Sequence, residues 1–190
     1  TQTAQAIALY LGIVPEGKEQ LVADKLCEVV RANNHFLDFG LLGSKSVPAM
    51  LTRYGYVEDA MKMITKTEAP SWGYWVETMG YTTLPETWTL SPEFRDASLN
   101  HVFMGDVSAW MMNQLAGINY DAVEPGFRHI LITPHFVERV NWAKGEYHSV
   151  RGLISSEWKR EGGKVTLTVT IPSGCTADIR VGDKTETVGS

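Results

Sequence analysis

The stretch ASLNHVFMGDVSAWMMNQLAG, residues 97–117, decides the fold because the pattern of apolar residues changes where it ends. Its apolar residues recur every three or four positions, which is the spacing of one face of a helix. Gly117 then supplies the residue type that commonly ends a helix. We therefore expect a helix over residues 97–116 and a different kind of structure after it. The apolar residues of this face are Leu99, Phe103, Val107, Trp110, Met111 and Leu115.

Upstream, shorter segments repeat the helical spacing and are separated by glycine and proline. Ser46 with Pro48 is typical of a helix start, and Gly55 of a helix end. Ser71 can cap a further short helix, which Gly80 would end. The first part of the chain is thus predicted to be a succession of helices. The expected helices cover residues 3–13, 19–30, 46–54, 57–65 and 72–79.

Downstream of Gly117, the apolar residues alternate with polar ones. Between Val165 and Ile171, valine, leucine and isoleucine alternate with threonine, a period of two that predicts a strand with one buried face. Residues 161–164, Glu-Gly-Gly-Lys, are typical of a tight hairpin turn. We expect residues 118–190 to form a small antiparallel β-domain, most simply a sandwich. Further strands are expected within residues 130–132, 140–147, 153–158 and 177–181.

Length and composition restrict the class of protein. The 190 residues suffice for one full core or two small ones, and 44% of them are hydrophobic. The formal net charge is −5 and no basic cluster is visible, which argues against nucleic acid or an anionic membrane as a partner. The apolar runs fall short of the ~20 residues of a membrane span. Cys27 and Cys175 do not suggest a disulfide framework, so no compartment is predicted.

A glutamate in a loop is the first candidate for chemistry. Glu86 lies between Pro85 and Trp88, and a carboxylate surrounded by apolar rings is a candidate general base. The plainer alternative is an exposed loop carboxylate. His101 follows at the expected start of a helix, where it is either a ligand for a substrate or a residue bonded to nearby backbone. The residues alone leave both pairs of alternatives open.

Three tryptophans are candidate sugar contacts, and the sequence lacks the common metal, nucleophile and nucleotide motifs. Trp72, Trp75 and Trp88 can stack on the apolar face of a sugar ring, although tryptophans at such spacing are more often part of a core. There is no C-x-x-C, H-E-x-x-H, G-x-S-x-G, P-loop or G-x-G-x-x-G pattern. We therefore expect no metal and no cofactor.

Three segments resemble the C-terminal part of bacterial α-L-rhamnosidases of glycoside hydrolase family 78. They are TTLPETW at residues 82–88, SLNHVFMGDVSAWMMNQLAGI at 98–118, and EPGFRHILITPHF at 124–136. The resemblance implies an α+β fragment: residues 1–117 would be part of an (α/α)6 toroid of helical hairpins, and residues 118–190 a C-terminal β-sandwich. It also implies a rhamnose-containing carbohydrate as substrate. The opening of the chain in the middle of a helical pattern suggests a piece of a longer protein.

The same resemblance implies roles for individual residues. Glu86 matches the glutamate of the TT-x-x-E-x-W motif, which is the general base of an inverting reaction in that family. His101 matches a histidine that binds the rhamnose hydroxyls. Pro85 departs from the family pattern, which has an aromatic residue before the glutamate, and proline can set the loop differently.

The general acid expected of such an enzyme is missing from the sequence. In the family it belongs to an acidic motif well upstream of the base, and no segment between Thr1 and Tyr81 resembles it. Asp38 is expected to be structural and partly buried, and Asp59 is expected on a solvated helix face. Two other interpretations stay open: a non-catalytic carbohydrate-binding or interaction protein, and a helical scaffold with an unrelated β-tail.

Overall fold

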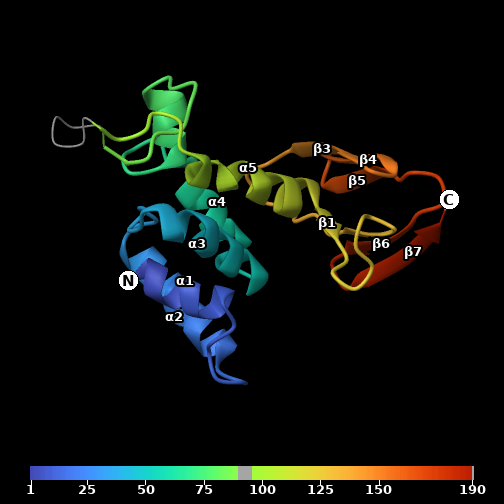
Figure 1. Ribbon diagram of the computed structural model, residues 1–190, viewed down its shortest axis with the longest axis horizontal. Coiled ribbons are helices and arrows are strands. Elements are labelled where there is room, and N and C mark those ends of the chain that lie inside the picture. Colours follow the sequence, from blue (N-terminus) through green and yellow to red (C-terminus); the bar gives the residue numbers. More distant parts are fainter. Residues whose placement is uncertain (90–95, 190) are drawn as a thin grey trace. The chain divides into compact units, whose positions relative to one another are not determined.

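The computed structural model describes residues 1–89 and 96–189. The chain divides into two compact units, Thr1–Ser108 and Ala109–Ser190 (Figure 1). In the described residues the first unit is helical, and the second holds the strands together with the last helical turns. This confirms the predicted fold class, helices followed by a β-domain. The sequence places the boundary at Gly117, whereas the compact units meet between residues 108 and 109.

In its described residues the helical unit contains the four regular helices α1 to α4 and several short turns. α4 (Val57–Thr65) has the bounds that the sequence predicts, with Ala60, Met61 and Ile64 buried. Ser71 caps the next turn as expected, since its Oγ accepts a bond from the Tyr74 N–H at 2.9 Å. The remaining elements are α1 (Gln2–Tyr10), α2 (Glu19–Ala32), α3 (Leu41–Arg53), the π-helical turn η1 (Tyr74–Thr78) and the 3₁₀ turn η3 (Val102–Gly105).

The third helix begins five residues before the predicted start at Ser46. The helix begins without a side-chain cap, and Ser44 Oγ donates to the carbonyl of Leu41, its first residue, at 2.6 Å. Pro48 therefore lies inside the helix, where it removes one backbone hydrogen bond. Val47 and Leu51 beside it are fully buried, so packing holds the helix across the proline. Proline was the wrong marker for the helix start.

The predicted helix over residues 97–116 begins only at Val102. It runs through η3 and α5 (Asp106–Trp110) into the π-helical turn η4 (Met111–Ala116), and Gly117 ends it with a left-handed φ of +80°. Residues 97–101, the first part of the predicted helix, are not helical. Residues 98–101 instead hydrogen-bond to the backbone of residues 84–86. This long-range pairing competes with the local helical pattern, which the sequence alone does not reveal.

The described part of the second unit, residues 109–189, holds two sheets. Their orders are β1-β2-β6-β7 and β3-β4-β5, and Figure 1 shows the two as separate layers. β4 and β5 meet at the pair Glu161↔Lys164, which confirms the predicted hairpin turn. One detail differs from the predicted antiparallel domain, since β2 pairs with β6 in parallel. The strands are β1 (Ile118–Tyr120), β2 (His129–Ile132), β3 (Trp142–Ser149), β4 (Gly152–Glu161), β5 (Lys164–Thr170), β6 (Thr176–Val181) and β7 (Lys184–Gly189).

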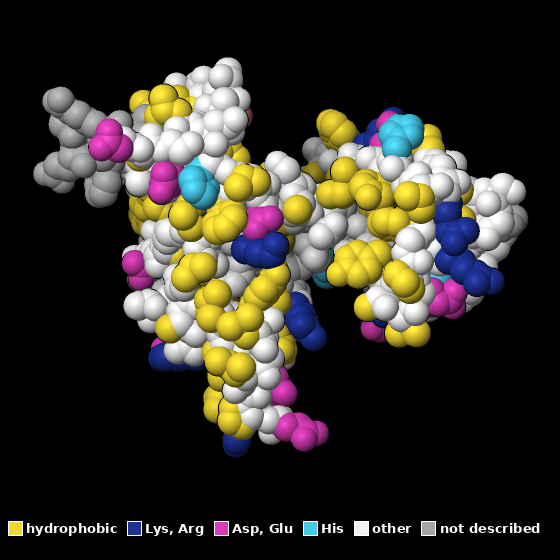
Figure 2. Space-filling model, viewed as in Figure 1, with side chains coloured by type: hydrophobic (Ala, Val, Ile, Leu, Met, Phe, Trp, Pro, Cys, Tyr) yellow, Lys and Arg dark blue, Asp and Glu magenta, His cyan; other side chains and the backbone are white. Residues whose placement is uncertain are grey.

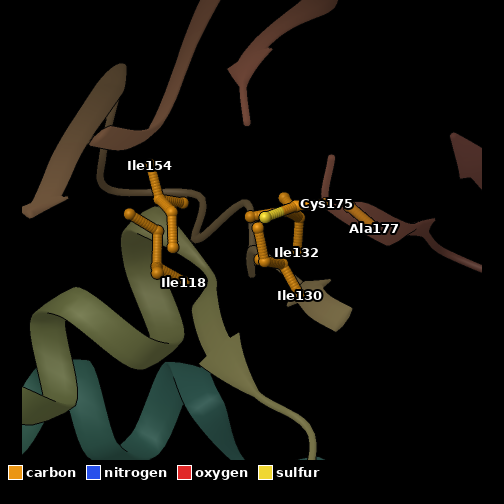
Figure 3. Close-up of a cluster of buried hydrophobic side chains, with 6 residues drawn as sticks. All are labelled: Ile118, Ile130, Ile132, Ile154, Cys175 and Ala177. Carbon is orange, nitrogen blue, oxygen red and sulfur yellow. The ribbon is translucent and has the colours of Figure 1, made fainter. Parts of the chain in front are cut away.

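Both sheets contribute to one core. Ile130 and Ile132 of β2 lie with Cys175 and Ala177 near β6, and Ile154 of β4 belongs to the same cluster of buried side chains (Figure 3). The helical turn η4 belongs to this core as well. Trp158 of β4 is fully buried and donates its indole N–H to the Leu115 carbonyl at 2.7 Å. This packing explains why residues 109–116 group with the strands although they are helical.

Gly117 joins η4 to β1 at a position that tolerates no side chain. A Cβ there would lie 2.3 Å from the Pro134 nitrogen and 2.6 Å from its Cα, and the backbone is left-handed. We expect Gly117→Ala to lower the free energy of unfolding by about 1–3 kcal/mol beyond the cost of the positive φ. Gly162→Ala is the matched control, because Gly162 has a φ of +54° but open space around its Cα. Thermal unfolding of both variants measures the difference, and equal losses would contradict the clash with Pro134.

Candidate active site

The candidate base Glu86 lies on a loop that is paired with residues 98–101. The Glu86 N–H donates to the Ser98 carbonyl at 2.8 Å, and the Ser98 N–H donates to Glu86 Oε2 at 3.0 Å. The His101 N–H donates to the Leu84 carbonyl at 2.8 Å. These bonds tie two short extended segments together. They hold the backbones of Glu86 and His101 near one another, although fifteen positions separate them in the sequence.

The Glu86 side chain is half-buried, and one of its oxygens is occupied by the backbone. The Ser98 N–H fixes Oε2 and so orients the carboxylate. Thr83 adds a further tie between the segments, since its Oγ1 donates to the Leu99 carbonyl at 2.7 Å. A carboxylate held in this way loses little orientational freedom when it acts on a substrate, which is the condition for efficient proton transfer.

His101 stands at the N-terminus of η3 and caps it. Its Nδ1 accepts the Phe103 N–H at 3.3 Å, and the two rings meet edge-on with centroids 5.4 Å apart. Because Nδ1 accepts, the neutral imidazole carries its proton on Nε2. His101 thus bonds to nearby backbone, as one sequence interpretation expects. Its Nε2–H is the donor that a sugar hydroxyl would require, so the two sequence interpretations are compatible.

The three candidate tryptophans form one aromatic cluster with Phe39. Trp88 stacks on Trp75 with centroids 4.4 Å apart and meets Trp72 edge-on at 5.1 Å. Their indole N–H groups all donate to backbone carbonyls, Trp72 to Met104, Trp75 to Trp88, and Trp88 to Phe39. Trp72 and Trp75 are only 3% and 1% exposed. Such rings offer no face to a sugar, so we assign these two residues a packing role instead of the substrate contact that the sequence suggests.

The cluster attaches the Glu86 loop to the rest of the helical unit. Trp88 follows Glu86 by two residues, and its ring and carbonyl are both held by Trp75. Trp88 is half-buried and is the one tryptophan of the three with an accessible part. A small hollow of about 230 Å³ lies against the same loop, but it is lined by residues 80–83, Pro85 and Leu99. The shared cleft for Glu86 and His101 that the sequence suggests stays a prediction.

Comparison with known proteins identifies the family. The family model of the bacterial alpha-L-rhamnosidase 6 hairpin glycosidase domain matches residues 1–115, and that of the bacterial alpha-L-rhamnosidase C-terminal domain matches residues 117–190. The chain belongs to the bacterial α-L-rhamnosidase family. This membership confirms the resemblance seen in the sequence and makes the chain part of a glycoside hydrolase family.

Curated relatives and solved structures agree with this family. An α-L-rhamnosidase of Streptomyces avermitilis is 30% identical over 187 residues, which are 94% of this chain and 18% of that protein. The crystal structure of an α-L-rhamnosidase from the same species, complexed with L-rhamnose, superposes with a TM-score of 0.89 at 27% identity over 98% of this chain and 20% of the other. The Aspergillus terreus enzyme gives a TM-score of 0.90 at 28% identity, over 99% of this chain and 22% of its own. The chain thus spans about a fifth of the rhamnosidases that it matches.

The hairpin unit also contains a buried cluster of charged side chains that the sequence does not predict. Asp59 was expected on a solvated face, but it is only 4% exposed. Its carboxylate accepts two bonds from the Arg31 guanidinium, at 2.9 and 2.8 Å, and lies 2.8 Å from His35 Nε2. These bonds, those of Arg31 first, lower the pKa of Asp59 to about 2. The Asp59 carboxylate is therefore engaged in an ion pair that links α2 to α4. Asp38, which the sequence predicts to be partly buried, is instead exposed.

In residues 1–89 and 96–189, no group of three or more His, Cys, Asp or Glu side chains is arranged to hold a metal ion. No helix in the described ranges is both long and apolar enough to cross a membrane. Cys27 and Cys175 are both buried and free. Burial, with the Asp59 carboxylate as a smaller cause, raises the pKa of the Cys27 thiol to about 11, so this thiol stays protonated at neutral pH.

Proposed function

We propose that this chain is part of an inverting α-L-rhamnosidase that removes terminal α-L-rhamnosyl residues from glycosides or polysaccharides. Glu86 is its general base and His101 binds the rhamnose hydroxyls. The observation that carries the proposal is the bond from the Ser98 N–H to Glu86 Oε2, because it orients the carboxylate on a segment paired with His101. Membership of the rhamnosidase family supplies the reaction class.

An inverting hydrolysis needs one water and two carboxyl groups. The water attacks the anomeric carbon and gives its proton to the base, while an acid protonates the leaving glycosidic oxygen. The two carboxyl groups are about 6.5–9.5 Å apart in such enzymes, which leaves room for the water. Ser98 occupies Glu86 Oε2, so we assign the other oxygen, Oε1, to the attacking water. The Nε2–H of His101 would donate to a sugar hydroxyl and fix the ring beside this water.

The partner acid is proposed to lie outside these residues. Among the described residues of the hairpin unit, Asp59 is the most buried carboxylate; it is bonded to Arg31 and His35 and is not available for proton donation. The relatives are about five times longer than this chain, so they have room for an acid elsewhere. We propose that residues 1–117 supply one wall of the site and the general base. Trp88, half-buried beside Glu86, is the tryptophan retained as a sugar contact.

A non-catalytic carbohydrate-binding protein is the second candidate. The observation in its favour is the lone carboxylate: the described bonds tie Glu86 to backbone and not to a second acid. Both candidates bind rhamnose, but only the enzyme needs the charge on Glu86. Substitution of Glu86 therefore separates them, and substitution of His101 tests the binding that they share.

His101→Ala in the full-length enzyme is expected to weaken L-rhamnose binding by about 2–10-fold, the effect of losing a hydrogen bond of about 0.5–1.5 kcal/mol. His148→Ala is the control, because His148 is an exposed histidine on β3 in the other unit. Calorimetric titration with L-rhamnose measures both variants. Unchanged binding in His101→Ala would remove His101 from the site and with it the proposed convergence on Glu86.

A further inference from the structure

The loop that carries Glu86 is tied to residues 98–101 by a side-chain hydroxyl as well as by backbone bonds. Thr83 Oγ1 donates to the Leu99 carbonyl at 2.7 Å. The backbone bonds of the same pairing join residues 84–86 to residues 98–101. Because Leu99 belongs to the second of these segments, the threonine hydroxyl adds a side-chain bond to the backbone pairing.

The pairing is short, and neither segment belongs to a strand of a sheet. Two short extended segments that pair only with each other are marginally stable in water. Residues 67–89 and 96–101 contain no lysine or arginine. Figure 2 shows few charged side chains on the part of the helical unit that holds residues 72–89. Among the described residues, hydrogen bonds hold the two segments together, so each of these bonds contributes a large share of the order of the loop.

The Glu86 carboxylate takes its orientation from this pairing, because its Oε2 accepts the Ser98 N–H at 3.0 Å. Any slip of one segment along the other moves Ser98 and lets the carboxylate rotate. Thr83 precedes Glu86 by three residues and Leu99 follows Ser98 directly, so the Thr83 bond opposes this slip. We propose that Thr83 is a positioning residue, whose hydroxyl holds the two segments in register and keeps Glu86 aimed at the attacking water. This proposal rests on the proposed role of Glu86 as general base.

The chemistry of threonine suits this role and makes it testable. A β-branched side chain has few rotamers, so its hydroxyl needs little ordering to reach the Leu99 carbonyl. Thr83 is exposed, so a substitution there leaves no cavity in a core. Valine keeps the branched shape without the hydroxyl, and serine keeps the hydroxyl without the branch. The two substitutions therefore separate the effect of the hydrogen bond from the effect of shape.

Kinetics of the full-length enzyme on an aryl α-L-rhamnoside test the proposal. We expect Thr83→Val to lower kcat about tenfold, below the ~10²-fold cost of a 1 Å misplacement because the backbone bonds remain. KM should change by less than about twofold, since the loss falls on the proton transfer. Thr83→Ser should keep at least about a third of kcat. Thr78→Val is the control, because exposed Thr78 also donates to a carbonyl, that of Thr67 at 2.6 Å, and should leave kcat unchanged.

Two further measurements show whether Thr83 acts through Glu86. Amide hydrogen exchange of the full-length enzyme reports the order of the loop without turnover. We expect the amides of Glu86, Ser98 and His101 to exchange at least about threefold faster in Thr83→Val and at the unchanged rate in Thr78→Val. In the second measurement, Thr83→Val is combined with Glu86→Gln. It should cause little further loss of turnover there, because the carboxylate that it positions is already gone.

Other results would overturn the proposal. Unchanged kcat and unchanged exchange in Thr83→Val would show that the loop does not need this bond. A raised KM with unchanged kcat would make Thr83 a substrate contact in the small hollow that it helps to line. An equal loss in the Glu86→Gln background would mean that Thr83 acts on another group. If Glu86→Gln alone keeps near-full turnover, the proposed function fails, and exchange still decides whether Thr83 orders the loop. Thr83→Ala repeats each comparison if Thr83→Val does not fold.

Discussion

Replacement of Glu86 with glutamine in the full-length enzyme is expected to lower the turnover of an aryl α-L-rhamnoside by ~10²–10⁴-fold. This is the usual contribution of a general base. The amide keeps the shape of the side chain, and its Oε atom can still accept the Ser98 N–H that now binds Glu86 Oε2. It cannot take a proton from the attacking water. The loss should therefore appear in kcat, with L-rhamnose binding changed by less than about threefold.

A matched carboxylate shows whether the effect belongs to this position. Glu77 is an exposed glutamate on η1 in the same unit, so Glu77→Gln removes the same charge without touching the loop. We expect its turnover to equal that of the unchanged enzyme. Near-full turnover in Glu86→Gln would refute Glu86 as the base. No measurable turnover in the unchanged full-length protein, together with intact rhamnose binding, would favour the non-catalytic alternative.

The 190-residue chain is a second comparison for the same prediction. It carries the proposed base but not the proposed acid, so the glycosidic oxygen would leave without a proton. We expect no turnover above background from this chain. Any turnover that Glu77→Gln spares and Glu86→Gln removes would mean that a carboxylate of these residues acts as the acid, and would overturn the proposal that the acid lies elsewhere.

Elements that depend on local pattern were predictable from the sequence. The bounds of α4, from Val57 to Thr65, follow from one apolar face, and β5 (Lys164–Thr170) lies within one residue at each end of the alternation predicted between Val165 and Ile171. The hairpin at Gly162 and Gly163 follows from turn chemistry, because both residues adopt a positive φ. In each case the physical cause lies within a few residues, so the sequence contains the whole signal.

Elements that depend on distant partners were not predictable. Residues 98–101 have a helical pattern, but their backbone bonds to residues 84–86 instead. The parallel pairing of β2 with β6 joins residues 47 positions apart, such as His129 and Thr176. A local pattern cannot weigh such bonds against a helix or a hairpin. The same limit applies to α3, whose course through Pro48 depends on burial by the surrounding helices.

The candidate site was predictable only in part, because its geometry also depends on distant partners. Glu86 and His101 could be chosen by motif, but the Ser98 bond that orients Glu86 joins residues twelve positions apart. The sequence suggests Trp72 and Trp75 as sugar contacts because exposed and buried tryptophans have the same sequence pattern. Their burial follows from packing against Phe39 and Trp88, which only the fold brings together.

Asp59 is expected to make a large electrostatic contribution to stability. Its pKa of about 2 lies below the ordinary value of 3.8, because the Arg31 guanidinium bonds to its charged form. A difference of nearly two pKa units corresponds to about 2 kcal/mol of stability. We expect Asp59→Asn to lower the free energy of unfolding by about this amount at pH 7. The ~3–5 kcal/mol cost of breaking a fully buried pair is not reached, because the Arg31 side chain remains 58% exposed.

The pH dependence distinguishes a charge effect from a packing effect. A carboxylate whose folded pKa is depressed stabilises the fold above its unfolded pKa, and this contribution is lost as the pH falls through the folded value. The difference between Asp59 and Asp59→Asn should thus be constant from pH 7 to about 5, decrease below about 4, and largely vanish near pH 2. Urea unfolding followed by the helical circular dichroism signal measures it. A difference that persists at pH 2 would show that shape, not charge, makes the contribution.

A surface carboxylate on α2 provides the control for this last prediction. Glu28 forms an ion pair with Lys25 at 2.9 Å, but its side chain is 67% exposed. Solvent screens such pairs, so Glu28→Gln should change stability by less than about 1 kcal/mol at any pH. The contrast follows from burial, since the two carboxylates differ little in the distance to their cationic partners. Equal effects of the two substitutions at pH 7 would mean that the Arg31–Asp59 pair does not hold α2 against α4.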